Sequence, residues 1–240
     1  MTFFNEHGYE TLNPGWPGDS PTVAESRANP HPIGNRGVTE VVDSYAKVIT
    51  SLHEAPIVIG HSFGGLIAQV ILGRGIAAAA IAIDPAPIKG VWQLPFSALK
   101  ASFPVLGNPF NLKKAISLTF DQFKYGFANA VPEQEARELY DRWTIPAPAR
   151  PLFQAATATF AGSETKVNTA NTKRGPLLIT GGEKDHIAPP ILGQASAKKY
   201  NSSVITEFNL FAGRGHSLIA DHGWREVAEY SLAWLNKNGF

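Results

Sequence analysis

The sequence predicts an α/β protein in which a mostly parallel sheet is covered by helices on both faces. Three short apolar runs are continuous rather than alternating and end at glycine- or proline-bearing turns, which is typical of strands buried on both sides. They span residues 56–59, 79–83 and 177–180. Apolar residues recur with a helical period at 41–52 and 224–235. Because strands and helices alternate along the chain, a parallel sheet is favoured.

A further strand and an insertion complete the expected organisation. Residues 204–211 have the mixed polarity of a strand nearer a sheet edge. From 88 to 172 the alternation stops, and proline-bounded helical fragments such as 132–143 occur without a convincing strand. We therefore expect a core made of residues 1–87 and 173–240, with a helical cap at 88–172.

The cap segment is rich in aromatic side chains and holds 12 of the 25 aromatic residues of the chain. They are Trp92, Phe96, Phe103, Phe110, Phe120, Phe123, Tyr125, Phe127, Tyr140, Trp143, Phe153 and Phe160. A small helical module needs large side chains to form a core of its own. An apolar roof over a substrate pocket needs them as well, and the composition leaves both roles open.

Length and charge exclude several classes of protein. The 240 residues suffice for one large domain or two small ones, and 44% of them are hydrophobic. Lys and Arg number 21 against 20 Asp and Glu, and basic residues cluster no further than pairs, so nucleic-acid binding is not expected. The longest apolar run, 76–83, is far shorter than the roughly 20 residues of a membrane span. The first ten residues do not resemble a secretory signal and cysteine is absent, so we expect a cytoplasmic protein.

The strongest motif, GHSFGG at 60–65, lies between an apolar strand and a helical segment. Gly-x-Ser-x-Gly in this context is typical of a tight turn that lifts the serine hydroxyl above the sheet, which makes Ser62 the candidate nucleophile. Side chains two residues to either side of the serine would collide, so we expect glycine to be required at 60 and 64. The following helix directs its N-terminal dipole toward Ser62, and the N–H of Phe63 becomes a candidate oxyanion donor.

A serine hydroxyl needs a base to remove its proton, and His216 is the candidate. It lies in the glycine-rich loop 212–217, directly after the strand expected at 204–211, where strand-end loops converge. His61 adjoins the nucleophile but is expected to point away, and His186 adjoins a better-placed aspartate. We expect packing or surface roles for His7, His31, His53 and His222.

The base needs a carboxylate that holds its tautomer and stabilises the imidazolium, and Asp185 is the candidate. It follows the strand at 177–180 within the sequence GGEKD. Asp84, which ends the strand at 79–83 ahead of a proline, is the main rival, and Glu183 is a weaker one. No cofactor is expected. We expect no metal site either, because cysteine is absent and no HExxH-like spacing occurs.

Through these motifs and their order along the chain, the sequence resembles members of the α/β-hydrolase superfamily. The likeness rests on GHSFGG, on GGEKD after a strand and on GRGHS after the last strand. The segment 12–20 is also similar to the family's turn after its fourth strand, and the likeness extends over nearly the whole chain. It implies a hydrolase with the order Ser62, Asp185, His216 and a helical cap between the sixth and seventh strands.

The chain departs from the family pattern at its beginning. In the family, three strands normally precede the turn that 12–20 resembles, and the loop after the third carries a His-Gly motif that supplies a second oxyanion donor. Neither these strands nor that loop precedes the turn here. The fourth strand is expected near 10–13. A late start site, a natural truncation, and a variant in which the fourth-strand segment pairs directly with the fifth are open explanations. An unpaired central strand edge would favour a homo-oligomer or poor stability.

The function expected from these residues is that of a carboxylic ester hydrolase acting on a small or medium, largely apolar ester. The cap aromatics favour an apolar substrate, and Ser62 argues against dehalogenases and epoxide hydrolases, which use an aspartate at this turn. Cleavage of thioesters, lactones or carbon–carbon bonds, and perhydrolysis, use the same triad and stay open. The alternative is a non-catalytic pseudoenzyme or ligand-binding protein that keeps the fold without a complete oxyanion hole.

Overall fold

A four-stranded parallel sheet forms the centre of the protein, with the strand order β1-β2-β5-β6. The computed structural model describes residues 1–158 and 164–240. The strands span Ile57–His61 (β1), Ala79–Ile83 (β2), Leu177–Gly182 (β5) and Thr206–Phe211 (β6). The four strands expected from apolar and mixed runs at 56–59, 79–83, 177–180 and 204–211 are therefore confirmed, and β6 lies at a sheet edge, as its mixed polarity indicated. A separate antiparallel pair is formed by β3 (Ala115–Ile116) and β4 (Ala147–Pro148).

Helices account for most of the remaining regular structure. The α-helices of the described residues are α1 (Thr2–Glu6), α2 (Val23–Ala28), α3 (Val38–Thr50), α4 (Phe63–Gly73), α5 (Phe96–Leu106), α6 (Phe120–Gly126), α7 (Glu133–Trp143), α8 (Arg150–Thr157), α9 (Pro190–Ala197) and α10 (Trp224–Lys237). Two 3₁₀ turns are η1 (His31–Ile33) and η2 (Pro109–Asn111). The helical periods predicted α3 and α10, and α7 lies within the proline-bounded helical fragment expected at 132–143. None of the helices in the described ranges is long and apolar enough to cross a membrane.

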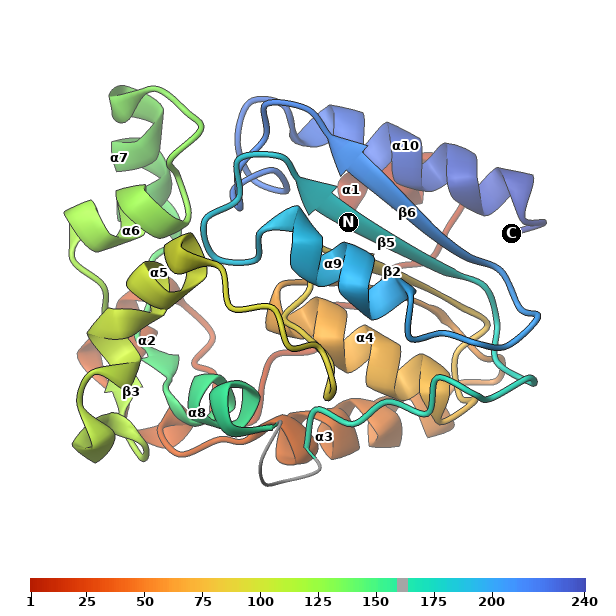
Figure 1. Ribbon diagram of the computed structural model, residues 1–240, viewed down its shortest axis with the longest axis horizontal. Coiled ribbons are helices and arrows are strands. Elements are labelled where there is room, and N and C mark those ends of the chain that lie inside the picture. The colour runs from red at the N-terminus through yellow and green to blue at the C-terminus, as the bar shows by residue number, and fades with distance from the viewer. Residues whose placement is uncertain (159–163) are drawn as a thin grey trace.

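The helices cover both faces of the sheet, as the alternation predicts (Figure 1). α4 and α9 lie on one face, with α3 beside α4, and α1 and α10 lie on the other. In β2, Ala80 and Ala82 pack into the core that contains α4, whereas Ile81 and Ile83 pack into the core that contains α10. Successive strand residues point to opposite faces, so a strand buried on both sides must be apolar throughout.

The segment 88–172 is mainly helical. Figure 1 shows α5, α6 and α7 on the side toward which the strand arrowheads point. A small core joins α6 to α7 and contains the buried residues Phe123, Ala128, Ala136 and Leu139. The expectation that this segment lacks strands was wrong, because β3 and β4 pair within it. Of the aromatic residues noted above, Phe160 lies outside the described residues. The division of the chain into core and cap stays a prediction.

Residues 10–13 do not form the strand expected there. The Thr11 hydroxyl instead donates a hydrogen bond to the Asn5 side chain at 2.7 Å, and Leu12 is 60% exposed. Because the segment has no buried apolar face, packing does not draw it into the sheet. The turn that follows is present: the Trp16 N–H donates to the Asp19 carboxylate at 2.7 Å.

β1 forms the other edge of the sheet in the part of the chain that the structure describes. Direct pairing of residues 10–13 with this strand, one of the explanations considered above, is therefore wrong. Ile59 of β1 is 39% exposed. An unpaired strand edge presents backbone N–H and C=O groups to other chains. The homo-oligomer expected on this ground stays a prediction.

The turn from β1 into α4 brings two backbone segments into close contact. A Cβ placed on Gly60 would lie 2.0 Å from the Gly64 carbonyl oxygen, so only glycine fits at position 60. A Cβ on Gly64 would meet nothing within 4 Å, and the clash expected at position 64 was therefore wrong. Gly65 is the second constrained glycine, because its Cβ would lie 2.9 Å from the Cβ of Pro85.

Gly60 and Gly64 form a matched pair of substitution sites for testing the turn. We expect Gly60→Ala to lower the free energy of unfolding by about 3 kcal/mol, because the new methyl group collides with backbone that cannot move aside cheaply. Gly64→Ala should be neutral or stabilise by up to about 1 kcal/mol, since alanine favours the helix. Urea unfolding followed by circular dichroism measures both. Equal effects of the two substitutions would contradict the described turn.

Candidate active site

Strand ends bring the sequence-predicted residues to one edge of the sheet. Ser62 directly follows β1, Asp185 follows β5 and His216 lies in the loop after β6. The rival acid Asp84 directly follows β2. Because the carboxyl ends of parallel strands share one edge, these segments approach one another although they are far apart in the sequence.

Asp185 and His216 form a buried hydrogen-bonded pair. The Oδ2 atom of Asp185 lies 2.6 Å from Nδ1 of His216. The N–H groups of Ile187 and Ala188 donate to the other oxygen at 2.7 and 2.9 Å. Burial raises the pKa of Asp185, but the charge and hydrogen bond of His216 outweigh it and lower the pKa to about 2. At neutral pH the carboxylate can therefore only accept, so Nδ1 of His216 carries the proton.

Ser62 is held at the turn by its backbone. Its φ of 55° and ψ of −120° are unusual for a residue with a side chain. Its N–H donates to the Ile83 carbonyl at 2.9 Å, and its own carbonyl accepts from the Ala86 N–H at 3.0 Å. Phe63 is the first residue of α4, so its N–H has no acceptor within the helix. In the described part of the chain, no hydrogen bond joins the Ser62 hydroxyl to His216.

His61 lies against the base, which corrects the expectation that it points away. The ring centroids of His61 and His216 are 4.4 Å apart, and Phe127 of the segment after α6 packs edge-on against both rings. The Nε2 atom of His61 is buried without a hydrogen-bond partner among the described residues. Sequence reasoning missed this contact, because His61 and His216 are far apart in the chain and meet only through the fold.

Asp84 stands beside the pair as a second buried carboxyl group. Its Oδ1 accepts a hydrogen bond from the Gly182 N–H at 2.9 Å, and its Oδ2 lies 4.0 Å from Nδ1 of His216. Burial and the charge of Asp185 raise the pKa of Asp84 well above its ordinary value. The closer carboxylate, Asp185, is therefore the ionised one. The weaker rival, Glu183, instead accepts from the Gly213 N–H at 2.7 Å.

The loop that carries His216 is fixed by an ion pair that sequence reasoning missed. The guanidinium of Arg214 contacts the buried carboxylate of Asp221 and donates to the Gly223 carbonyl at 2.9 Å. The same carboxylate accepts a hydrogen bond from the Ser217 hydroxyl at 2.7 Å. These contacts tie both flanks of His216 together. Only the pattern GRGHS, with polar residues on either side of the histidine, could have indicated them.

A loop that follows α6 packs closely over the strand-end loops. The Asn129 side chain donates to the Lys184 carbonyl at 2.7 Å. A Cβ on Gly215 would lie 3.0 Å from both the Ala130 Cβ and the Asn129 side-chain oxygen, so the two loops touch. Together with Phe127, these contacts place part of the segment 88–172 directly against His216.

Three of the other histidines make described contacts away from Ser62, Asp185 and His216. His7 bonds to the Phe3 carbonyl at 2.7 Å, and His222 pairs with Glu135 of α7 at 2.8 Å. His186 bonds to the Tyr125 carbonyl at 2.8 Å and so links α6 to the loop after β5. None of these three contacts involves Ser62, Asp185 or His216.

Two groups within the described ranges bring three candidate metal-ligand atoms within 4.8 Å of one another. The first group is His61, Asp84 and His216, and the second is Glu135, Asp221 and His222. One member of each group is already engaged, His216 by Asp185 and Asp221 by Arg214. The expectation that the protein uses neither a metal nor a cofactor stays a prediction.

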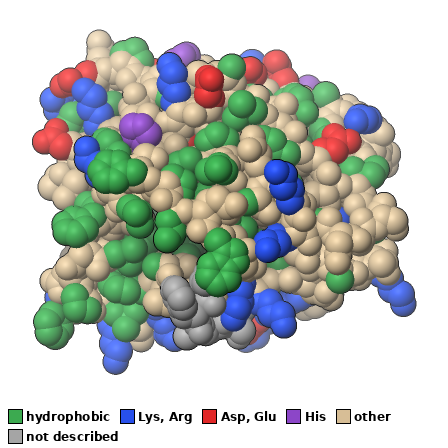
Figure 2. Space-filling view, viewed as in Figure 1, with side chains coloured by type: hydrophobic (Ala, Val, Ile, Leu, Met, Phe, Trp, Pro, Cys, Tyr) green, Lys and Arg blue, Asp and Glu red, His purple; other side chains and the backbone are tan. Residues whose placement is uncertain are grey.

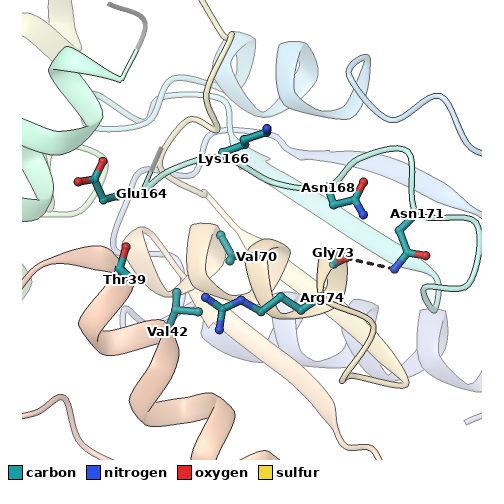
Figure 3. A pocket seen from close by; sticks show the side chains of 9 residues that line it. All are labelled: Thr39, Val42, Val70, Gly73, Arg74, Glu164, Lys166, Asn168 and Asn171. Carbon is teal, nitrogen blue, oxygen red and sulfur yellow. Dashed lines mark hydrogen bonds between the residues drawn. The ribbon is translucent and has the colours of Figure 1, made fainter. Parts of the chain in front are cut away.

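A cavity of about 550 Å³ lies apart from these residues, beside α3 and α4 (Figure 3). Thr39 and Val42 of α3 line one side, and Lys166 lines another. The Arg74 guanidinium, which also lines it, pairs with Asp43 at 2.8 Å. None of the sequence-predicted site residues contributes to this cavity, so it is not the place where the predicted chemistry would occur.

The contact between His61 and His216 predicts acid sensitivity. Burial, followed by repulsion from His216, lowers the pKa of His61 from 6.5 to about 3. Between these values the unfolded chain binds a proton that the folded chain does not, so stability is lost as pH falls below 6.5. At pH 5 the loss from this group is about 2 kcal/mol. Urea unfolding at pH 7 and at pH 5 measures this loss of unfolding free energy. We expect the loss in His61→Gln to be smaller than that in the native chain by about 2 kcal/mol. Equal losses in the two proteins would contradict the lowered pKa of His61.

The comparisons with known proteins agree with this architecture. The family model described as "Alpha/beta hydrolase family" matches residues 2–230, whereas no curated protein matches the chain. The monoacylglycerol lipase of Paleococcus ferrophilus is similar in structure, with a TM-score of 0.57 and 22% identity over 86% of this chain and 77% of that one. An Arabidopsis methylesterase has a TM-score of 0.63 and 13% identity over 98% and 90%. A structure of the metagenome-derived lipolytic enzymes LipS and LipT has a TM-score of 0.63 and 19% identity over 98% and 85%.

Structural matches at such low sequence identity show the fold alone, whereas the family model shows which family the chain belongs to. It covers almost the entire chain, from α1 into α10, including the four-stranded sheet and the turn at Ser62. The resemblance noted from the sequence motifs, the parallel sheet flanked by helices and the family model all point to the same conclusion. The chain belongs to the alpha/beta hydrolase family.

Proposed function

We propose that this protein is a serine hydrolase that cleaves a small or medium, largely apolar carboxylic ester. The observation that carries the proposal is the combination of a serine in left-handed backbone at a strand-to-helix turn with a buried Asp185–His216 pair at the same sheet edge. A serine in that position presents its hydroxyl above the sheet, and the pair supplies the base that it needs.

The proposed reaction has two stages. Nε2 of His216 accepts the Ser62 hydroxyl proton as the serine oxygen attacks the ester carbonyl, and the N–H of Phe63 donates to the oxyanion. The imidazolium then gives that proton to the leaving alcohol, which leaves an acyl-serine. Water, deprotonated by His216, attacks the acyl carbonyl, and Ser62 regains its proton as the acid departs.

Asp185 is the proposed acid of this mechanism. Its ionised carboxylate accepts from Nδ1 of His216, which leaves Nε2 free of a proton and ready to act as the base. Burial and the charge of Asp185 raise the pKa of Asp84 well above its ordinary value, which disfavours its charged form, so Asp84 is the weaker candidate for stabilising the imidazolium.

An apolar substrate is supported by the surroundings of the base. Phe127 lies 5.4 Å from the His216 ring, centroid to centroid, and packs with the cluster around α6 and α7. A substrate that reaches His216 therefore meets aromatic and aliphatic carbon. The similar structures named above are a lipase, a methylesterase and lipolytic enzymes, all of which act on esters.

A non-catalytic role is the alternative, and one feature favours it. In the family the second oxyanion donor comes from a His-Gly motif that follows a strand, whereas the two His-Gly pairs of this sequence, His7-Gly8 and His222-Gly223, follow α1 and precede α10. Loss of one such donor typically lowers turnover about 10²–10³-fold and leaves the nucleophile and base in place. A weak hydrolase and a pseudoenzyme therefore differ in whether residual turnover depends on Ser62.

Four variants test the assignment of roles. With a p-nitrophenyl ester, we expect Ser62→Ala and His216→Ala to abolish hydrolysis above background. Asp185→Asn should lower kcat by about 10³–10⁴-fold, because the base loses its ionised partner. Asp84→Asn should keep kcat within about tenfold, because asparagine copies the shape of a neutral carboxyl group.

These variants distinguish a serine hydrolase from a non-catalytic protein, and Asp185 from Asp84 as the acid. Hydrolysis unaffected by Ser62→Ala would contradict the mechanism, and no hydrolysis by any form of the folded chain would favour the non-catalytic role. A loss in Asp84→Asn as large as that in Asp185→Asn would assign the acid to Asp84. Circular dichroism of each variant controls for folding.

A further inference from the structure

One face of α5 exposes large apolar side chains to solvent. Phe96, Leu99 and Phe103 are 79%, 50% and 70% exposed. Residues three and four positions apart lie on the same side of a helix, so these three form one continuous stripe. The opposite side of α5 packs against α6, where Ala101 lies near Gly126. Among the described residues, the stripe is therefore the side of α5 that is left exposed to solvent.

The residues flanking α5 extend the stripe. Leu94, just before the helix, is 75% exposed, and Phe110 in η2 is 82% exposed. We call these five residues the α5 apolar face: Leu94, Phe96, Leu99, Phe103 and Phe110. Figure 2 shows hydrophobic side chains gathered over the part of the molecule where Figure 1 places α5. Soluble proteins expose apolar patches of this kind mainly where they bind something.

The charged residues in the segment that carries this face are all positive. Residues 85–120 contain four lysines, Lys89, Lys100, Lys113 and Lys114, and no aspartate or glutamate. That segment alone has a formal charge of +4, whereas the whole chain has +1. Lys113 and Lys114 are exposed next to η2, and Lys100 of α5 lies 4.0 Å above the Tyr125 ring. Lys100, Lys113 and Lys114 therefore lie on or beside the elements that carry the apolar face.

This charge decides between the candidate partners. A second copy of the chain would bring the same lysines against these lysines, which opposes self-association through this face. An anionic lipid surface supplies the opposite charge and attracts lysines that lie near it. Aromatic and leucine side chains on one side of a helix, with lysines beside them, are the combination that inserts into the headgroup region of a bilayer.

We propose that the α5 apolar face, together with Lys100, Lys113 and Lys114, binds this protein peripherally to anionic phospholipid membranes. Phe96, Leu99 and Phe103 enter the boundary between headgroups and acyl chains, and the lysines contact the lipid phosphates. The proposal concerns attachment to the surface and does not depend on ester hydrolysis. It would place the strand-end loops near a phase in which apolar esters dissolve.

Vesicle co-sedimentation tests this attachment on the full chain carrying Ser62→Ala, so that turnover plays no part. We expect binding to vesicles of phosphatidylcholine mixed with phosphatidylglycerol, weak binding to phosphatidylcholine alone, and loss of binding at high salt. Adding Phe96→Ser and Phe103→Ser should weaken binding at least about tenfold. The matched control is Ile205→Ser with Leu210→Ser, two residues at β6 that are 47% and 43% exposed.

Charge-reversal variants test whether Lys113 and Lys114 contribute to membrane binding. Lys113→Glu with Lys114→Glu should weaken binding to the anionic vesicles, whereas Lys47→Glu with Lys173→Glu, which changes the total charge equally elsewhere, should not. The proposal is overturned if the chain does not bind anionic vesicles, or if the two phenylalanine substitutions leave binding unchanged. Self-association that those substitutions abolish, measured by light scattering, would instead assign the face to a second copy. Circular dichroism checks that all variants fold.

Discussion

The close approach of β1 to the start of α4 is the constraint on which the rest of the site depends. A backbone oxygen of Gly64 occupies the space that a side chain at position 60 would need. This contact turns the chain so sharply that Ser62 adopts left-handed backbone dihedrals. The helix that begins at Phe63 then points its free N–H groups toward the serine. The close contact between Gly60 and Gly64 therefore fixes how β1, Ser62 and α4 lie relative to one another.

The second determinant is a small buried group of ionisable residues whose environments differ. Asp185 receives hydrogen bonds from two backbone N–H groups and from His216, which keeps it ionised despite its burial. Asp84 receives one such bond, from Gly182, and its burial and the charge of Asp185 raise its pKa well above the ordinary value. The pKa values of two aspartates at neighbouring strand ends are thus shifted in opposite directions. The lowering at Asp185 comes mainly from the charge and hydrogen bond of His216, and the raising at Asp84 mainly from burial.

Much of this arrangement can be predicted from sequence, because its causes are local. Continuous apolar runs indicate strands buried on both faces, and the turn motif indicates where β1 becomes α4. The contact of His61 with His216 could not be predicted, since it depends on how loops from β1 and β6 meet in space. The strand expected at 10–13 rested on resemblance, and the exposed, polar residues there have no face to bury. Aromatic enrichment in 88–172 suggested a core or a roof, whereas five of its members, Trp92, Phe96, Phe103, Phe110 and Trp143, are more than half exposed.

The central claim is that the turn at Ser62 and the Asp185–His216 pair together activate the serine. Treating the full chain with a fluorophosphonate, followed by intact mass and peptide mapping, tests this claim without knowledge of the substrate. We predict a single adduct on Ser62 that is lost in His216→Ala. A folded chain that remains unlabelled, or labelling of Ser62 that persists without His216, would contradict the claim.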